Sequence, residues 1–405
     1  MLRNKLSKLD KHFGSSGIKK AAEKEEVEYN RYRVAKELLG GEVCDFSGGR
    51  FLKIKSNFNA AYKHGNLTIG QLGKFEPCRY FHFDRFGSQE SINPEKLLFF
   101  DMETTGLGGS GTVPFLVGFG SVRGGSFQVR QYFLPDYPDE AAMLEAVREE
   151  ITDDTIVVSY NGKSFDMPIL IDRMIINRVE QNLEFAGHID LLHSARRLYR
   201  RRLGSCTLSN IERNILDFQR FDDIPGELVP AVYFDWLNNI GTELLGRVVE
   251  HNLNDIVSLY FLMYHIALAQ DNPGDRLADA DDIYSVARIF EKRKEYDKVY
   301  QVLTDCRQII SDNKRYDILY MQSMACKRIG RFDEAVGIWT DLSGKSNEQT
   351  FMALIELAKY YEHRKRDYTT ALKYSYKAQK VCPARRYDMD NIVKRMSRLE
   401  RKSKK

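Results

Sequence analysis

The chain has 405 residues, more than one typical domain needs, and 43% of them are hydrophobic, which suits a globular protein with a buried core. Its apolar runs fall short of the roughly 20 residues that span a membrane, and the opening MLRNKLSKLDKHFG lacks the apolar stretch of a secretory signal. The net charge of +4 permits a nucleic-acid partner without requiring one. We therefore expect a cytoplasmic protein of two or three domains that does not associate with membranes.

Residues 1–92 form the least regular part of the sequence and are interpreted as an N-terminal extension. The segment 23–41 has the pattern of a helix that stops at glycine, and residues 49–58 and 78–86 have the composition of short strands. We expect this extension to pack on the domain that follows it. The six cysteines of the chain form no C-x-x-C pair, which argues against a disulfide framework and a zinc ribbon: Cys44, Cys78, Cys206, Cys306, Cys326 and Cys382.

Residues 93–268 alternate between strand and helix patterns and are predicted to form one α/β domain. The pattern is three strands joined by tight turns, followed by helix, strand, helix, strand and further helices. This order favours a mixed sheet with helices on its faces. The predicted strands cover 97–102, 112–122, 125–134, 155–162 and 187–192, and the predicted helices include 139–151, 167–179 and 242–268.

Residues 269–282 are polar, contain Pro and Gly, and are predicted to be a linker. Beyond them, residues 283–405 have a wholly helical pattern in which an aromatic residue recurs about every 36 positions at Tyr296, Phe332 and Tyr368. A small or branched residue stands three positions after each of these aromatic residues, at Val299, Ala335 and Ala371. The spacing indicates tetratricopeptide-like helical hairpins followed by a basic tail. That tail is either a solvated helix face or an arm that contacts phosphate.

The stretch LLFFDMETTGLGGSG, residues 97–111, ends an apolar strand on two carboxylates and a glycine-rich loop. Gly106, Gly108 and Gly111 spell G-x-G-x-x-G, which is typical of dinucleotide-binding loops when a helix follows. Here the residues after Gly111 have a strand pattern, so no helix N-terminus would face a pyrophosphate. We interpret the glycines as a flexible hairpin loop beside the acids.

Asp101 and Glu103 are two positions apart on a strand, so their side chains share one face. Two carboxylates held this close repel each other, and a hard divalent cation such as Mg²⁺ or Mn²⁺ removes that cost. Such a pair alone is more often a surface turn. Asp166 alone would be interpreted as a helix cap, and His251 with Asp255 alone is more often a charged helix stripe or a capped histidine. The combination of all three segments is what favours a metal site.

The combined motifs resemble those of the DEDD 3′→5′ exonuclease superfamily, which has a ribonuclease H-like fold. The match covers about residues 97–268 and consists of Asp101-Met-Glu103-Thr-Thr-Gly, Asn161-Gly-Lys-Ser-Phe-Asp166 and His251-Asn-Leu-Asn-Asp255. The histidine stands at the spacing that the superfamily's tyrosine branch uses. The layout, with its N-terminal extension and C-terminal repeats, is similar to that of the bacterial YprB-like, or mitomycin-repair, exonucleases.

The resemblance implies two divalent cations, Mg²⁺ or Mn²⁺, held by Asp101, Glu103, Asp166 and Asp255. It implies that His251 accepts the proton of an attacking water, because a histidine titrates near neutral pH. It also implies that four further residues approach the terminal nucleotide. These are Thr104, Thr105, Gly106 and Asn161.

The segment HSARRLYRRRLGS is the strongest candidate for holding the phosphate backbone. Its arginines, among them Arg196, Arg200 and Arg201, can neutralise phosphates, and Tyr199 can stack on a base. The alternative is a solvated helix face. We keep both interpretations open.

Three functions fit the sequence. The resemblance favours a DNA exonuclease in repair that works with a helicase partner, with protein recruitment through the C-terminal repeats. RNA trimming by the same chemistry is an alternative, because nothing in the motifs contacts a 2′-hydroxyl. A scaffold that binds nucleic acid without cleaving it is the non-enzymatic alternative.

Overall fold

The computed structural model describes residues 31–72, 93–106, 108–109, 111–179, 183–271, 273–312, 315–383 and 386–404. The chain divides into two compact units. Unit 1 runs to Arg196 and includes Ser205–Ala267, while unit 2 comprises Arg197–Gly204 and Leu268–Lys405. The strand pattern predicted at residues 78–86, together with Cys78, lies outside the described residues, and so does the first part of the helix predicted at residues 23–41.

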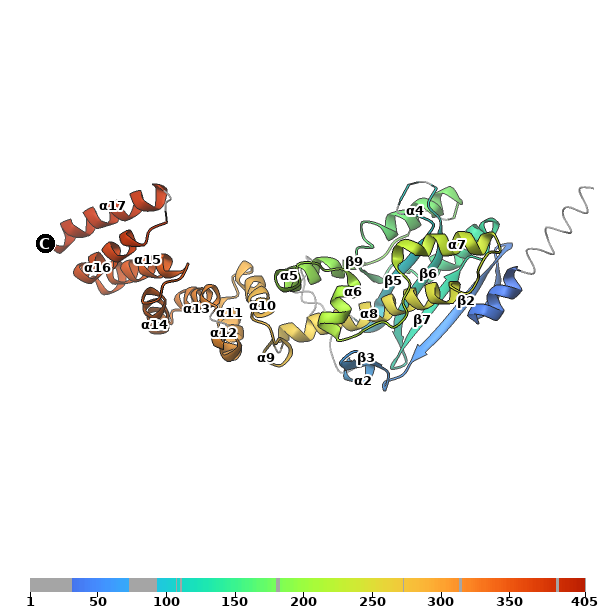
Figure 1. Ribbon diagram of the computed structural model, residues 1–405, viewed down its shortest axis with the longest axis horizontal. Coiled ribbons are helices and arrows are strands. Elements are labelled where there is room, and N and C mark those ends of the chain that lie inside the picture. The colour runs from blue at the N-terminus through green and yellow to red at the C-terminus, as the bar shows by residue number, and fades with distance from the viewer. Residues whose placement is uncertain are drawn as a thin grey trace, which may run out of the picture. The chain divides into compact units, whose positions relative to one another are not determined.

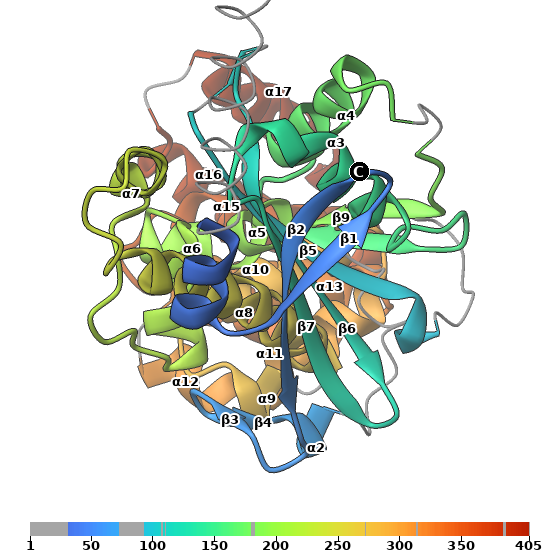
Figure 2. The ribbon, with the colours of Figure 1, turned by 90° about the vertical axis from the view of Figure 1, so that its right-hand side faces the viewer.

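Unit 1 contains a mixed seven-stranded sheet in the order β1-β2-β7-β6-β5-β8-β9. Figures 1 and 2 show this sheet from two directions. The β5–β8 and β8–β9 pairs are parallel, and the other neighbouring pairs are antiparallel. The α/β fold with a mixed sheet is therefore confirmed. The strands are β1 (Glu42–Phe46), β2 (Gly49–Phe58), β5 (Leu97–Thr104), β6 (Pro114–Arg123), β7 (Ser126–Phe133), β8 (Ile156–Ser159) and β9 (Gly187–Asp190).

The β6–β7 hairpin shows why the tight-turn prediction held. Arg123 pairs with Ser126, so the turn consists of Gly124 and Gly125 alone. Both glycines have positive φ, at 56° and 77°. The common two-residue hairpin turn needs positive φ at both of its residues, and glycine adopts this conformation without strain. In the predicted N-terminal extension, β1 and β2 extend this sheet, because β2 pairs with β7. A second, two-stranded sheet combines β3 (Lys63–His64) with β4 (Leu67–Thr68).

The alternation of side chains along β5 separates the two faces of the large sheet. Phe99 contacts Tyr260 of the long helix α8 (Leu245–Asp271). Phe100 belongs instead to the apolar cluster that holds Met143 of α3 (Glu140–Arg148). The other helices and turns of this part of the chain are α2 (Ile69–Leu72), η2 (Pro94–Lys96), η3 (Tyr137–Asp139), α4 (Asp166–Ile176), α5 (Leu191–Leu203), α6 (Leu208–Ile211), η4 (Glu212–Leu216), η5 (Gly226–Leu228) and α7 (Val229–Leu237).

Unit 2 is helical, and successive helices pack against one another (Figure 1). Tyr296, Phe332 and Tyr368 each begin a helix, and Val299, Ala335 and Ala371 are each fully buried one turn later. Residues 269–282, which the sequence predicts to be a linker, contain the end of α8, helix α9 and the first residues of α10. The helices of this part are α9 (Pro273–Arg276), α10 (Ala280–Lys292), α11 (Tyr296–Asp305), α12 (Arg307–Asp312), α13 (Tyr316–Arg328), α14 (Phe332–Ser343), α15 (Thr350–Tyr360), η6 (Tyr361–Lys365), α16 (Tyr368–Lys380) and α17 (Arg386–Ser403).

The sequence argues against a membrane-spanning helix and against a disulfide framework, and both can be compared with the described part of the chain. Among its helices, none combines the length and the apolar character that crossing a membrane would require. Its cysteines are free thiols: Cys44, Cys206, Cys306, Cys326 and Cys382.

Candidate functional site

The last residues of β5 carry the first two carboxylates of the site. Asp101 and Glu103 are both half-buried and, as the strand alternation predicts, project to the same face. Asp101 lies opposite Gly118 in the β5–β6 register, and a bulge follows between Glu103 and Thr104. Bulges of this kind end regular pairing and redirect the chain beside active sites.

Helix α8 reaches these carboxylates because β6 carries glycines where the helix crosses it. A Cβ atom at Gly118 would overlap Ile256 and Asn252 of α8, and one at Gly120 would overlap Ile256. This close approach lets Asn252, which is fully buried, donate a hydrogen bond to Asp101 Oδ2 at 2.8 Å. Gln131 of β7 in turn donates to Asn252 Oδ1 at 2.8 Å, which fixes the amide.

His251 and Asp255 lie one turn apart on α8 and face Glu103. His251 Nε2 is 3.7 Å from Asp255 Oδ2. Glu103, His251 and Asp255 each offer one ligand atom, and these three atoms lie within 4.8 Å of one another. This arrangement is compact enough for the three side chains to share a metal ion.

Asp166 is the first residue of α4, a third segment, and its charge acts on both Asp101 and Glu103, although it is not one of the three residues whose ligand atoms lie within 4.8 Å of one another. The chain turns sharply before it, at Asn161, whose φ is 66°, and a Cβ on Gly162 would approach Asp166 Oδ2 to 2.9 Å. Asp190 supports this turn by accepting hydrogen bonds from the backbone N–H groups of Asn161 at 2.8 Å and Leu192 at 3.1 Å. Asp190 therefore caps the first turn of α5 and also holds the loop that precedes Asp166.

The charges of these groups change one another's protonation. Burial, reinforced by Asp255, Glu103 and Asp166, raises the pKa of Asp101 well above its ordinary value. Burial and neighbouring carboxylates likewise raise the pKa of Glu103 and of Asp166 to about 7. Burial lowers the pKa of His251, but Asp255 and Glu103 outweigh it, so the net pKa is raised. A set of carboxylate oxygen donors this dense fits hard divalent cations.

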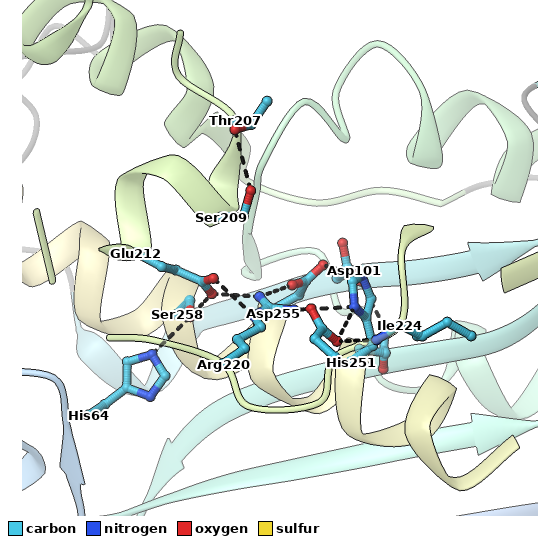
Figure 3. Close-up of polar contacts among 12 residues, drawn as sticks. His64, Asp101, Thr207, Ser209, Glu212, Arg220, Ile224, His251, Asp255 and Ser258 are labelled. Carbon is cyan, nitrogen blue, oxygen red and sulfur yellow. Dashed lines mark hydrogen bonds and ion pairs between the residues drawn. The ribbon is translucent and has the colours of Figure 1, made fainter. Parts of the chain in front are cut away.

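Arg220 is the cation that contacts this cluster, and it lies in the segment between η4 and η5 (Figure 3). Its guanidinium donates to Asp255 Oδ1 and, through Nη2 and Nε, to the buried Glu212 at 2.5 and 2.9 Å. Nη1 donates to Asp223 Oδ2 at 3.3 Å. Arg220 therefore ties the segment that carries it to the end of the acidic cluster.

Asp223 accepts a hydrogen bond from His251. The distance from His251 Nδ1 to Asp223 Oδ1 is 2.8 Å. With Nδ1 engaged, Nε2 is the ring nitrogen that faces Asp255. A carboxylate that fixes the tautomer and orientation of a histidine in this way is a recurring partner of general bases.

Glu212 is supported from the opposite side by a second buried contact. Ser258 of α8 donates to Glu212 Oε1, and His64 Nε2 lies 2.8 Å from the same hydroxyl oxygen. Burial lowers the pKa of His64 to about 3, with Arg220 adding to the effect, so the imidazole is neutral near pH 7. The hydrogen bonds therefore run from the β3–β4 hairpin through Glu212 and Arg220 to Asp255.

Three of the four residues predicted to approach a nucleotide, Thr104, Thr105 and Gly106, form the loop next to Glu103, whereas Asn161 lies in the turn before α4. Thr104 Oγ1 donates to the carbonyl oxygen of Gly106 at 2.6 Å, and Thr105 exchanges hydrogen bonds with the backbone of Val113. The threonines therefore shape the loop as well as bordering the acids. Beside this loop lies a pocket of about 270 Å³, lined among others by Thr112 and by Phe165, whose side chain is 51% exposed.

The arginines of α5 differ in their surroundings. Arg196 and Arg200 are exposed. Arg201 is paired with Asp281 at 2.5 Å and with Asp317 at 2.7 Å, so its charge already has two partners in unit 2. The prediction that Tyr199 stacks on a base is wrong, because its ring is fully buried.

Four residues of the site carried no signal in the sequence that we recognised. Asn252 stands inside the third motif, and the only sign of its role in the sequence is its position next to His251 on the same helix. Arg220 and Asp223 lie in an irregular segment, and Glu212 has no partner that its spacing predicts.

The fold and the acidic site together define an RNase H-like domain. The family model that matches, described as the RNase_H superfamily, covers residues 98–267. These residues include every residue that contributes a carboxylate to the site. The domain therefore belongs to a superfamily of nucleases, whose reaction is the hydrolysis of nucleic acid.

The chain belongs to the family of the Bacillus subtilis (strain 168) protein YprB. The two proteins are 30% identical over 418 residues, which cover 99% of each chain. Among solved structures, the family B DNA polymerase of Pyrobaculum calidifontis matches with a TM-score of 0.34 and 15% identity. That match covers 60% of this chain and 30% of the polymerase chain.

Proposed function

We propose that this chain is a DEDD-type 3′→5′ exonuclease that requires divalent cations and hydrolyses phosphodiester bonds of DNA. The observation that carries this proposal is the convergence of carboxylates from β5, α4 and α8, where burial and neighbouring carboxylates raise the pKa of Asp101, Glu103 and Asp166. Its context, by resemblance, is DNA repair in the cytoplasm.

We assign the site residues to two roles, metal binding and proton transfer. Asp101, Glu103, Asp166 and Asp255 would hold two cations, Mg²⁺ or Mn²⁺. When bound, these supply phosphate neutralisation and an acidified water. His251 Nε2 would accept the water's proton while Asp223 holds Nδ1.

The terminal nucleotide would lie along the loop of Thr104, Thr105 and Gly106, with Asn161 at the opposite edge. Phe165 offers an exposed ring to a base in the neighbouring pocket. Arg196 and Arg200, which are exposed, remain candidates for phosphate contacts, and Arg201 would need to share its charge with Asp281 and Asp317.

The C-terminal helices support a second part of the proposal. The matched positions of Tyr296, Phe332 and Tyr368 at helix starts favour tetratricopeptide-like hairpins, which commonly bind proteins. By resemblance, a helicase that exposes a DNA strand is the partner we propose.

The test is a cleavage assay with oligonucleotides labelled at either end, as single-stranded DNA, duplex DNA and RNA, with Mg²⁺, Mn²⁺ or EDTA. We expect shortening from the 3′ end of DNA in the presence of metal and no cleavage in EDTA. The variant Asp101→Asn should lose roughly 10³-fold in rate, because several kcal/mol of electrostatic stabilisation depend on the ligands.

The matched control is Asp153→Asn, which removes one exposed carboxylate away from the cluster and should cleave normally. Degradation of RNA alone would favour the trimming alternative. Binding without cleavage under any metal condition would favour the scaffold, and cleavage that persists in Asp101→Asn would reject this site.

A further inference from the structure

The solvent face of α16 carries a basic stripe with an exposed aromatic ring. Lys373, Tyr376, Lys377 and Lys380 stand at positions i, i+3, i+4 and i+7, which share one side of a helix. All four are exposed, and 43% of the Tyr376 side chain is accessible. The opposite side, with Ala371, Ser375 and Ala378, is buried. We call these four exposed residues the α16 stripe.

Within the part of the chain that the structure describes, none of the three lysines of the α16 stripe forms an ion pair. The neighbouring helix α17 differs in this respect. Its Arg395, Arg398 and Lys402 converge on the buried carboxylate of Glu362, at 2.7, 2.8 and 3.2 Å. Three cations therefore share one anion beside the stripe, which leaves that region positive as well.

The positive charge of the protein is concentrated in this part of the chain. Residues 364–405 contain 15 Lys and Arg against 4 Asp and Glu, whereas the preceding 363 residues contain 46 against 53. Arg364, Lys365 and Arg366 precede α16 and are exposed, as are Lys394 and Arg401 of α17. A surface this rich in unpaired cations costs electrostatic free energy unless an anionic partner binds it.

We propose that the α16 stripe binds single-stranded nucleic acid, with its lysines on successive phosphates and Tyr376 stacked on an unpaired base. The inference rests on the proposed function only for its partner class, and binding here requires no metal. A single strand fits because lysines track a backbone while an aromatic ring accepts any base. An anionic membrane fits less well, because a membrane-surface helix needs an apolar face, and that of α16 is buried.

Tyr376 is held in place by α17. Its hydroxyl donates to Glu400 Oε1 at 2.9 Å, which joins the two helices at the edge of the stripe. Two variants of Tyr376 therefore separate the effect of the ring from that of the hydroxyl group. Tyr376→Ala removes the stacking surface, whereas Tyr376→Phe removes only the hydrogen bond.

The experiment measures fluorescence anisotropy of a short labelled oligonucleotide, as a single strand and as a duplex, with the full chain in EDTA over a series of salt concentrations. The stripe variant replaces Lys373, Lys377 and Lys380 by Glu. We expect binding to weaken at least about tenfold and the slope of log K against log salt to fall by about 2, because three single-strand phosphate contacts are lost. Tyr376→Ala should weaken single-strand binding about tenfold, and Tyr376→Phe should bind like the wild type.

The control variant replaces Lys36, Lys292 and Lys294 by Glu, which changes the net charge equally at exposed lysines outside the stripe. Circular dichroism checks that all variants remain folded. The inference is overturned if the stripe variant binds as tightly as the control, if Tyr376→Ala weakens duplex and single-strand binding equally, or if only anionic vesicles bind. If the protein cleaves DNA but its binding does not depend on the stripe, only this inference is rejected. If binding depends on the stripe but no cleavage occurs, only the proposed function is rejected.

Discussion

At the scale of single residues, the site depends on side chains that hold other side chains. Asn252 fixes Asp101, Arg220 bridges Glu212 and Asp255, and Asp223 orients His251. A site that must bring carboxylates together needs such partners, because each unpaired buried charge is costly. The guanidinium of Arg220 lowers that cost where it contacts Asp255.

Asp223 provides the most informative test at this scale. The variant Asp223→Asn should lower the nuclease rate about 10- to 100-fold, as the loss of an orienting partner does. Because Asp223 helps to raise the pKa of His251, its loss should also move the acid limb of the pH–rate profile to lower pH. The neighbouring Asp222, whose side chain is 75% exposed, is the matched control, and Asp222→Asn should keep the wild-type profile. An unchanged profile in Asp223→Asn would contradict a role for this carboxylate in orienting the base.

At the scale of elements, the packing of α8 on β6 places the third motif against the first. The sequence was sufficient to predict that Asp101 and Glu103 share a strand face, and that His251 and Asp255 share a helix face. It was not sufficient to predict which helix crosses β5 and β6. That crossing depends on Gly118 and Gly120, which a single sequence presents only as two more glycines after a glycine-rich loop.

We expect Gly118→Ala to destabilise the protein by about 1–3 kcal/mol, because the added Cβ would overlap Ile256 and Asn252 and push α8 away. Urea denaturation followed by circular dichroism measures this change. Gly246→Ala is the control, since a Cβ there meets nothing and alanine favours a helix. Equal stability of the two variants would show that α8 does not depend on this close approach.

At the scale of the whole molecule, sequence reasoning succeeded where local patterns decide and failed where distant partners decide. The α/β order and the helical C-terminal region follow from periodicity alone. The ion pairs of Arg201 with Asp281 and Asp317 do not, because a run of arginines records the density of charge and not its partners. The burial of Tyr199 is a similar case.

The stability of the whole protein should depend on pH and metal together. The pKa of Glu103 and of Asp166 is about 7 when folded, against about 4 when unfolded, so the metal-free folded state binds more protons between these values. These groups therefore lower the stability of the metal-free protein as pH rises from about 4 to about 7. Mn²⁺ binds the deprotonated carboxylates, so its stabilising effect should grow over the same window.

Thermal unfolding at several pH values, with and without Mn²⁺, measures this coupling. We expect the Mn²⁺-induced rise in Tm to be larger above pH 7 than near pH 5, and to be strongly reduced in Asp101→Asn. A rise that is independent of pH, or equal in the variant, would indicate that Mn²⁺ stabilises the protein elsewhere.

The central claim is that Asp101, Glu103, Asp166 and Asp255 together hold divalent cations. An anomalous-difference map from crystals grown with Mn²⁺ tests it most directly. We expect manganese density among these carboxylates, and its loss in crystals of Asp101→Asn. Well-ordered carboxylates with no manganese between them, at a concentration that fills other sites on the protein, would contradict it.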